Sequence, residues 1–158
     1  RDLPRAEWTP AGPSSYELLY RSGAGLTPRP LRRIASGGEL SRVMLASKVV
    51  LGNADGVDTL VFDEVDAGVG GSTARALAGV LADLAATHQV IVVTHLAQVA
   101  VMADKHYVVS KEPGDVPQTH LDEVTGEART AEIARMLSGD QSEASLAHAK
   151  QMLEEARG

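Results

Sequence analysis

The stretch from Thr59 to Asp66 reads Thr-Leu-Val-Phe-Asp-Glu-Val-Asp, an apolar run that ends in carboxylates. A short apolar run that ends at turn residues predicts a buried strand. The run QVIVVTH, from Gln89 to His95, predicts a second one. Between them, a helix is expected from Ala74 to about Ala86, capped by Ser72 or Thr73. Buried strands joined through a helix are typical of an α/β fold, with a mostly parallel sheet flanked by helices.

The rest of the chain continues this alternation within a single domain over residues 1–158. Apolar residues at helical spacing predict a helix over Glu39–Leu51, followed by a glycine-containing break over 52–58. Prolines make residues 1–14 an irregular lead-in. The remaining predicted strands are at 15–22, 106–112 and 119–124, the last of which closes a hairpin through a turn at 113–118. The remaining predicted helices are at 96–103, 131–137 and 142–156.

Composition excludes several classes of protein. The chain has no cysteine, which rules out disulfides and thiol chemistry, and no apolar run reaches the roughly 18 residues of a membrane span. We therefore expect a cytoplasmic protein without a membrane partner. The formal net charge is −6, whereas domains that bind DNA by themselves are more often basic. The arginines at 29, 32 and 33 are read as a solvated loop rather than as phosphate contacts.

Candidate site residues follow the two central strands. In open α/β sheets, ligands bind at the carboxyl ends of the strands, where Asp63, Glu64 and His95 fall. One carboxylate near a phosphate suits Mg²⁺, and the adjacent one can polarise a water molecule. A histidine at the next strand end can bond a phosphate oxygen. Solvated acidic residues and a structural histidine are the plain alternative for each residue taken alone.

A glycine-rich helix start precedes these strands. Ser36, Gly37, Gly38 and Glu39 stand before an apolar helix, and free N–H groups at such a start bind anions. A capped loop without a ligand is the alternative. The chain has no P-loop, because none of its four lysines follows a glycine.

Taken together, four stretches resemble the C-terminal half of an ABC-type ATPase head. In order and spacing, ASGGE (35–39), TLVFDE (59–64), VDAGVGG (65–71) and VVTH (92–95) are similar to the signature motif, the Walker B strand, the D-loop and the switch-histidine strand. Valine at position 65, where transporters usually have proline, is similar to SMC-like proteins. Longer stretches, such as 30–51 and 93–111, resemble SMC-like proteins of bacterial DNA double-strand-break repair and recombination. The resemblance runs from about Tyr16 to the last helix.

The resemblance implies that the P-loop lies in an N-terminal half, separated from this half by a long antiparallel coiled coil from which residues 1–14 lead in. The two halves would fold into one head, and two heads would sandwich ATP and Mg²⁺ in an ATP-dependent dimer that acts on DNA at the nucleoid. Hydrolysis of ATP to ADP and phosphate would need the other half, so this chain alone would be inactive.

The resemblance also assigns roles to single residues. Glu64 would be the general base and His95 the γ-phosphate sensor, and Asp63 would hold Mg²⁺ through water. Arg42 is a candidate phosphate or inter-head contact. The signature residues, which would contact ATP on the opposite head, are Ser36, Gly37, Gly38 and Glu39; the D-loop residues are Asp66, Gly68, Val69 and Gly70. The family usually has Leu-Asp where this chain has Val69-Gly70, so contacts of that aspartate are not carried over.

Two other functions stay open from the residues alone. A Mg²⁺-dependent phosphohydrolase or nuclease could use Asp63, Glu64 and Asp66, and would need no partner. A non-catalytic module could dock a partner on its terminal helices. A Ser-His-Asp hydrolase is disfavoured because GGSTA, at 70–74, lacks the G-x-S-x-G turn.

Overall fold

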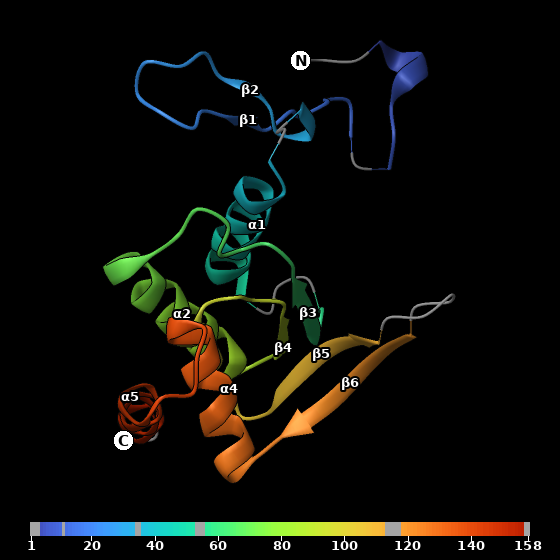
Figure 1. Ribbon diagram of the computed structural model, residues 1–158. Helices are drawn as coiled ribbons and strands as arrows, with labels where there is room; N and C mark the ends of the chain where they lie inside the picture. Colours follow the sequence, from blue (N-terminus) through green and yellow to red (C-terminus); the bar gives the residue numbers. More distant parts are fainter. Residues whose placement is uncertain (1–3, 11, 34–35, 53–55, 113–117, 157–158) are drawn as a thin grey trace.

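The computed structural model of the chain describes residues 4–10, 12–33, 36–52, 56–112 and 118–156. Figure 1 shows a β1–β2 arm at one end, a central region built from α1, β3, α2 and β4, and a β5–β6 hairpin beside the terminal helices. In chain order the elements are η1 (Arg5–Glu7), β1 (Leu19–Tyr20), β2 (Arg29–Pro30), η2 (Leu31–Arg33), α1 (Gly37–Leu51), β3 (Thr59–Phe62), α2 (Gly71–Ala85), β4 (Gln89–Val92), α3 (Ala97–Ala100), β5 (His106–Glu112), β6 (Gln118–Val124), α4 (Gly126–Ser138) and α5 (Glu143–Glu155).

The central pair of strands is parallel, as predicted. Strand β3 pairs with β4 so that Phe62 lies opposite Val92, and α2 makes the crossover between them. Leu60 and Phe62 are buried because alternate residues of a strand point to one face. They pack into a cluster with α1, α2 and α3, whose other buried members are Leu45, Val65, Leu77, Ala78, Leu81, Leu84 and Val99. This packing holds α1, α2 and α3 against one face of the strand pair.

The opposite face of this strand pair is uncovered by the described residues. Val61 is 66% exposed, and Ile91 and Val93 are also exposed although all three are β-branched and apolar. Parallel sheets are ordinarily covered on both faces. The described helices therefore cover one face of the pair and leave an apolar face open.

A second cluster joins α3 to the two terminal helices. Ile133 and Ala134 of α4 are fully buried against Ala149 and Leu153 of α5 and against α3. Helix α4 ends at Gly139, whose φ of 77° is the left-handed conformation that favours glycine. The predicted terminal helices are therefore present, and they pack on their own domain.

The prediction of a mostly parallel sheet is wrong. The described strands form three two-stranded sheets, of which β3–β4 is parallel and β1–β2 and β5–β6 are antiparallel. The physical reason is the connection: a parallel pair needs a crossover the length of a helix, whereas the short link between β5 and β6 allows only a hairpin.

Several predicted boundaries also differ. Helix α2 begins at Gly71 with Gly70 as its N-cap and no side-chain cap bond, so the cap predicted at Ser72 or Thr73 is wrong. Helix α4 begins at residue 126 rather than 131, and the strand predicted over 15–22 is paired only at residues 19–20. Residues 113–117 of the predicted turn at 113–118, part of the break at 52–58 and residues 1–3 and 11 of the lead-in lie outside the described residues. Among the described helices, none has the length and apolar character needed to cross a membrane.

Candidate functional site

The start of α1 packs against the turn that follows β3. Ser36 caps the helix, because its hydroxyl accepts a hydrogen bond from the Glu39 N–H at 3.4 Å. Gly38 is buried, and a Cβ at this position would lie 2.8 Å from both the Glu64 carbonyl oxygen and the Ala67 Cβ. A Cβ at Gly37 would meet the Glu64 carboxylate. The paired glycines therefore have an intramolecular role, since they allow the helix start to approach the turn.

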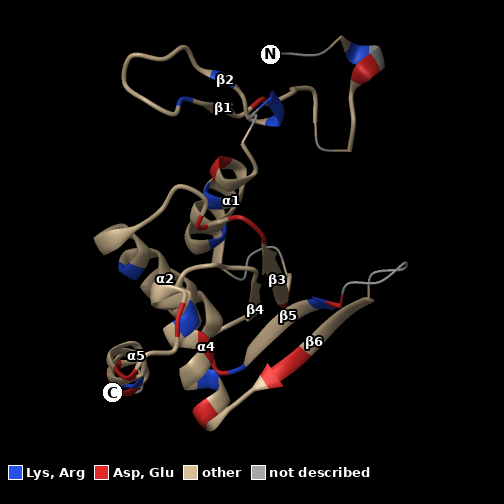
Figure 2. Ribbon diagram, viewed as in Figure 1, with Lys and Arg blue, Asp and Glu red and all other residues tan. Residues whose placement is uncertain are grey.

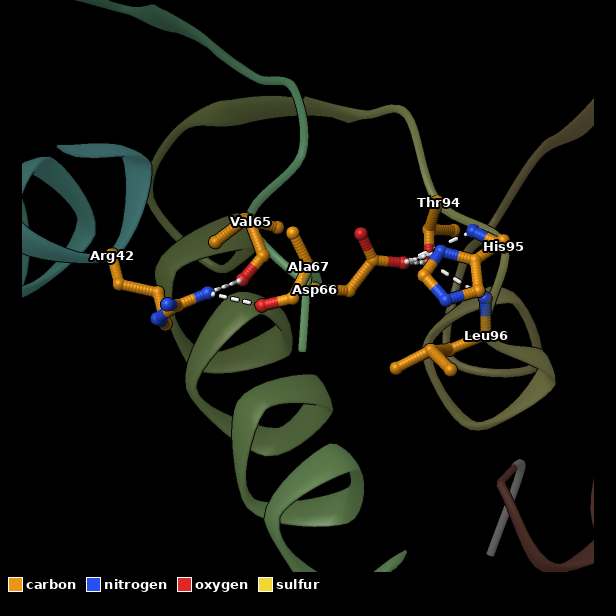
Figure 3. Close-up of polar contacts among 7 residues, drawn as sticks. All are labelled: Arg42, Val65, Asp66, Ala67, Thr94, His95 and Leu96. Atoms are coloured by element: carbon orange, nitrogen blue, oxygen red, sulfur yellow. Dashed lines mark hydrogen bonds and ion pairs between the residues drawn. The ribbon is translucent and has the colours of Figure 1, made fainter. Parts of the chain in front are cut away.

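Two side chains of α1 fasten the same turn through its backbone. The Ser41 hydroxyl donates a hydrogen bond to the Asp63 carbonyl oxygen at 2.6 Å. The Arg42 guanidinium donates from Nη1 to the carbonyl oxygens of Val65 at 3.2 Å and Ala67 at 2.8 Å (Figure 3). Arg42, predicted as a phosphate or inter-head contact, is thus half-buried and bonded within its own domain, where it supports residues 63–67.

The turn presents two carboxylates to solvent. Asp63 and Glu64 directly follow β3, and both are exposed. Figure 2 shows this acidic stretch, drawn red, between the start of α1 and the end of β3. Glu64 has a φ of 56°, and among the described residues it is the non-glycine residue with a positive φ. Such backbone costs about 1–3 kcal/mol and persists only where surrounding contacts enforce it.

Asp66 is buried, with 2% of its surface exposed, in contrast to the exposed Asp63 and Glu64. Its Oδ2 accepts hydrogen bonds from the Thr94 hydroxyl at 2.5 Å and from the His95 N–H at 3.0 Å. The same oxygen lies 3.1 Å from Nδ1 of the His95 ring (Figure 3). The carboxylate thus joins the turn after β3 to the loop after β4.

The geometry does not support a phosphohydrolase or nuclease that binds its metal ion with Asp63, Glu64 and Asp66 together. Among the described residues, no group of three or more histidine, cysteine or acidic side chains could hold a metal ion. Asp66 is buried and bonded to Thr94 and His95, whereas Asp63 and Glu64 are exposed. Two exposed carboxylates beside a phosphate still fit Mg²⁺, which usually takes one or two protein carboxylates, several waters and the substrate's own phosphates.

The predicted D-loop residues differ in how far they are buried. Val69 is half-buried against the central core, whereas Gly68 and Gly70 are exposed and Gly70 caps α2. Two participants were missed from the sequence, Ser41 and Thr94. Thr94 carried a weak signal, a hydroxyl directly before His95 in an otherwise apolar run, whereas Ser41 carried none.

The arginines at 29, 32 and 33 lie on β2 and η2, in the arm (Figure 2). Arg32 forms an ion pair with Glu17 at 2.7 Å, and both side chains are substantially exposed. Exposed pairs of this kind contribute about 0–1 kcal/mol. The expectation of a solvated loop therefore stays a prediction, with Arg32 paired to an acidic neighbour.

The curated proteins to which the chain is similar include several DNA repair proteins of the same name from different bacteria. No family model matches the chain. The chain is 52% identical over 146 residues to the DNA repair protein RecN of Treponema pallidum, a match that covers 91% of this chain and 26% of that protein. RecN of Deinococcus radiodurans is 52% identical over 149 residues, covering 94% and 26%, and RecN of Streptomyces coelicolor is 49% identical over 150 residues, with the same coverage. The chain therefore spans about a quarter of the length of these curated relatives.

A solved structure from work on ATP-driven dimerization and DNA-stimulated activation of SMC ATPases is also similar. It shares 21% sequence identity with a TM-score of 0.47, and the match covers 85% of this chain and 69% of that one.

Proposed function

We propose that this chain is the C-terminal half of an ATPase head in a protein like RecN, acting in DNA double-strand-break repair and recombination. The observation that carries the proposal is the meeting of three elements: the glycine-rich start of α1, the carboxylates after β3 and the histidine after β4. Ser41 and Asp66 hold the three together through hydrogen bonds to residues 63 and 95. Sequence identity of about 50% with RecN over most of the chain supports the same function.

The exposed carboxylate of Glu64 would act as general base, taking a proton from the water that attacks the γ-phosphorus while ADP leaves. Asp63 would hold Mg²⁺ through water, and the ion would neutralise charge that develops on the phosphates. His95 would contact the γ-phosphate. Each role needs an exposed side chain at a strand end, which all three residues have.

Ser36, Gly37, Gly38 and Glu39 would contact ATP held by a second head. Helix α1 has 15 residues, and its first N–H groups and dipole favour a negatively charged phosphate. Ser36 and Gly37 are exposed while Gly38 is buried, which supports Gly37 and the Ser36 hydroxyl as the groups that would make the most direct contact. Gly68 and Gly70, exposed on the turn before α2, would lie in the same interface.

The missing half of the head would cover the bare face of β3–β4. Val61 of β3, its strand partner Ile91 of β4, and Val93, one residue beyond β4, are the exposed apolar residues that it would cover. An N-terminal half that carries the P-loop is the occupant that the RecN resemblance implies. DNA would be bound by the assembled protein, since this segment carries a net charge of −6.

The test is ATP hydrolysis by this chain, alone and mixed with the separately expressed P-loop-bearing half from the same protein. We expect hydrolysis only in the mixture, and its loss in Glu64→Gln while ATP-driven association of heads persists. Glu154→Gln, an exposed acidic residue of α5 far along the chain, is the matched control and should hydrolyse ATP at the normal rate.

Two results would contradict the proposal. Hydrolysis by the chain alone would mean a self-contained phosphate site. A mixture that neither hydrolyses ATP nor associates in its presence would leave no role for the signature residues.

A further inference from the structure

Asp66 is the buried carboxylate of the site, and its burial has to be compensated. An ionised carboxylate removed from water is costly unless hydrogen bonds satisfy it. Here the compensation comes from the loop after β4: the Thr94 hydroxyl, the His95 N–H and the His95 ring. Asp66 belongs to a different loop, the turn after β3, so the contact spans the two strand ends.

The contacts of Asp66 indicate which nitrogen of the His95 ring is favoured to carry a proton. The Thr94 hydroxyl accepts a hydrogen bond from the Leu96 N–H at 3.0 Å, which leaves its own proton for Asp66. The Nδ1 atom of His95 lies 3.1 Å from the same carboxylate oxygen, an ion-pair distance, and a proton on Nδ1 is favoured there because a carboxylate oxygen only accepts. The ring nitrogen left over is Nε2, on a side chain that is 70% exposed.

We propose that Asp66 is a positioning residue for His95: it holds the ring proton on Nδ1 and so presents Nε2 to the ligand at the strand ends. Which nitrogen of a histidine faces its ligand is set by the hydrogen bond that the other nitrogen makes. A ring held in this way donates to a phosphate oxygen through Nε2 only when it is doubly protonated. The identity of the ligand rests on the proposed function. The position of the ring proton does not, because it is a property of this chain.

The first experiment is ¹⁵N NMR of the imidazole rings in the whole 158-residue chain, at a pH where the His95 ring is neutral. We expect the proton on Nδ1 in the unaltered chain, and on Nε2 in Asp66→Ala. Asp83→Ala, an exposed carboxylate of α2, is the matched control and should leave the His95 signals unchanged. A proton found on Nε2 in the unaltered chain overturns the proposal, whatever the fold of the variants.

A second variant tests the contact without removing the Asp66 carboxylate, in case Asp66→Ala fails to fold. Thr94→Val keeps the shape of the side chain but removes one donor to Asp66. It should leave the Nδ1 proton in place, because the ring still faces the carboxylate. If Asp66→Ala keeps a well-dispersed spectrum and the His95 proton stays on Nδ1, then Asp66 does not position the ring.

The functional experiment uses the chain assembled with its P-loop-bearing half. Asp66→Ala should lower kcat roughly 10- to 100-fold, the usual effect of losing the partner that orients a functional histidine at a metal site. Asp66→Asn, which keeps an acceptor, should recover part of that loss, and adding His95→Gln to Asp66→Ala should lower kcat no further. An unchanged kcat in Asp66→Ala contradicts the positioning role. Absence of hydrolysis by the unaltered assembly would instead refute the proposed function, and the NMR result would still decide the proton position.

Discussion

Substituting Gly38 by alanine tests whether the start of α1 really rests on the turn after β3. The new methyl group would lie 2.8 Å from the Glu64 carbonyl oxygen and 2.8 Å from the Ala67 Cβ. Neither neighbour is the free end of a flexible side chain, so backbone has to move. Overpacking of this kind costs about 1–3 kcal/mol, against at most about 1 kcal/mol gained because alanine favours a helix over glycine. We expect the free energy of unfolding to fall by about 1–2 kcal/mol.

Two other glycines serve as matched controls. Gly79 lies within α2, and a methyl group placed there would have no neighbouring atom within 4 Å, so Gly79→Ala should raise the free energy of unfolding by about 0.5–1 kcal/mol. At Gly37 the neighbour is the end of the Glu64 side chain, which can swing aside. Gly37→Ala should therefore change stability by less than about 0.5 kcal/mol.

The assay is urea denaturation of the 158-residue chain followed by circular dichroism, with a thermal melt as a check. The free energies of unfolding of Gly38→Ala and Gly79→Ala should differ by about 2 kcal/mol at an unchanged m value, or roughly 4–8 °C in Tm for a chain of this size. A Gly38→Ala variant as stable as Gly79→Ala would refute the reasoning, because it would mean that the helix start does not contact the turn.

Three further changes probe the rest of the fold. Ile133→Ala removes a side chain with 0% exposure from the second core cluster and should cost about 2–5 kcal/mol of unfolding free energy, measured by urea denaturation. Ser142→Ala removes the hydroxyl that accepts from the Ser145 N–H at the start of α5, and should cost about 1 kcal/mol in the same assay. Burial, and then the charge of Arg129, lower the pKa of His106 below its ordinary value of 6.5. Its contribution to stability is therefore present above pH 6.5 and is lost as the pH falls through the lowered value. Urea midpoints measured against pH should fall less steeply on acidification in His106→Asn.

The central region was well anticipated from sequence. The apolar runs at 59–62 and 89–92 alternate or continue as buried strands do, and the helix between them forces a parallel pair. Helix α1 and strand β5 were likewise predicted almost to the residue, because their apolar spacing is regular. The mostly parallel sheet was inferred from the central strand–helix–strand unit, although the turn at 113–118 already predicted a hairpin for the strands that became β5 and β6.

The candidate site was anticipated only in part. Asp63, Glu64 and His95 lie at the predicted strand ends. The hydrogen-bond partners of Asp66 and Arg42 depend instead on the direction in which each side chain points. Sequence periodicity carries no such information for a turn. Asp66 was interpreted as a D-loop residue or as part of a carboxylate cluster, and Arg42 as a phosphate or inter-head contact. In the structure both side chains form hydrogen bonds inside the domain.

The left-handed backbone at Glu64 has a consequence for how such a site survives mutation. Glycine or asparagine adopts that conformation more readily than glutamate. Substitutions that stabilise the fold at position 64 would therefore remove the carboxylate. Under the proposed role of Glu64 as general base, a variant of that kind would bind nucleotide without hydrolysing it. Screens for heat-resistant variants of this chain would then enrich inactive ones.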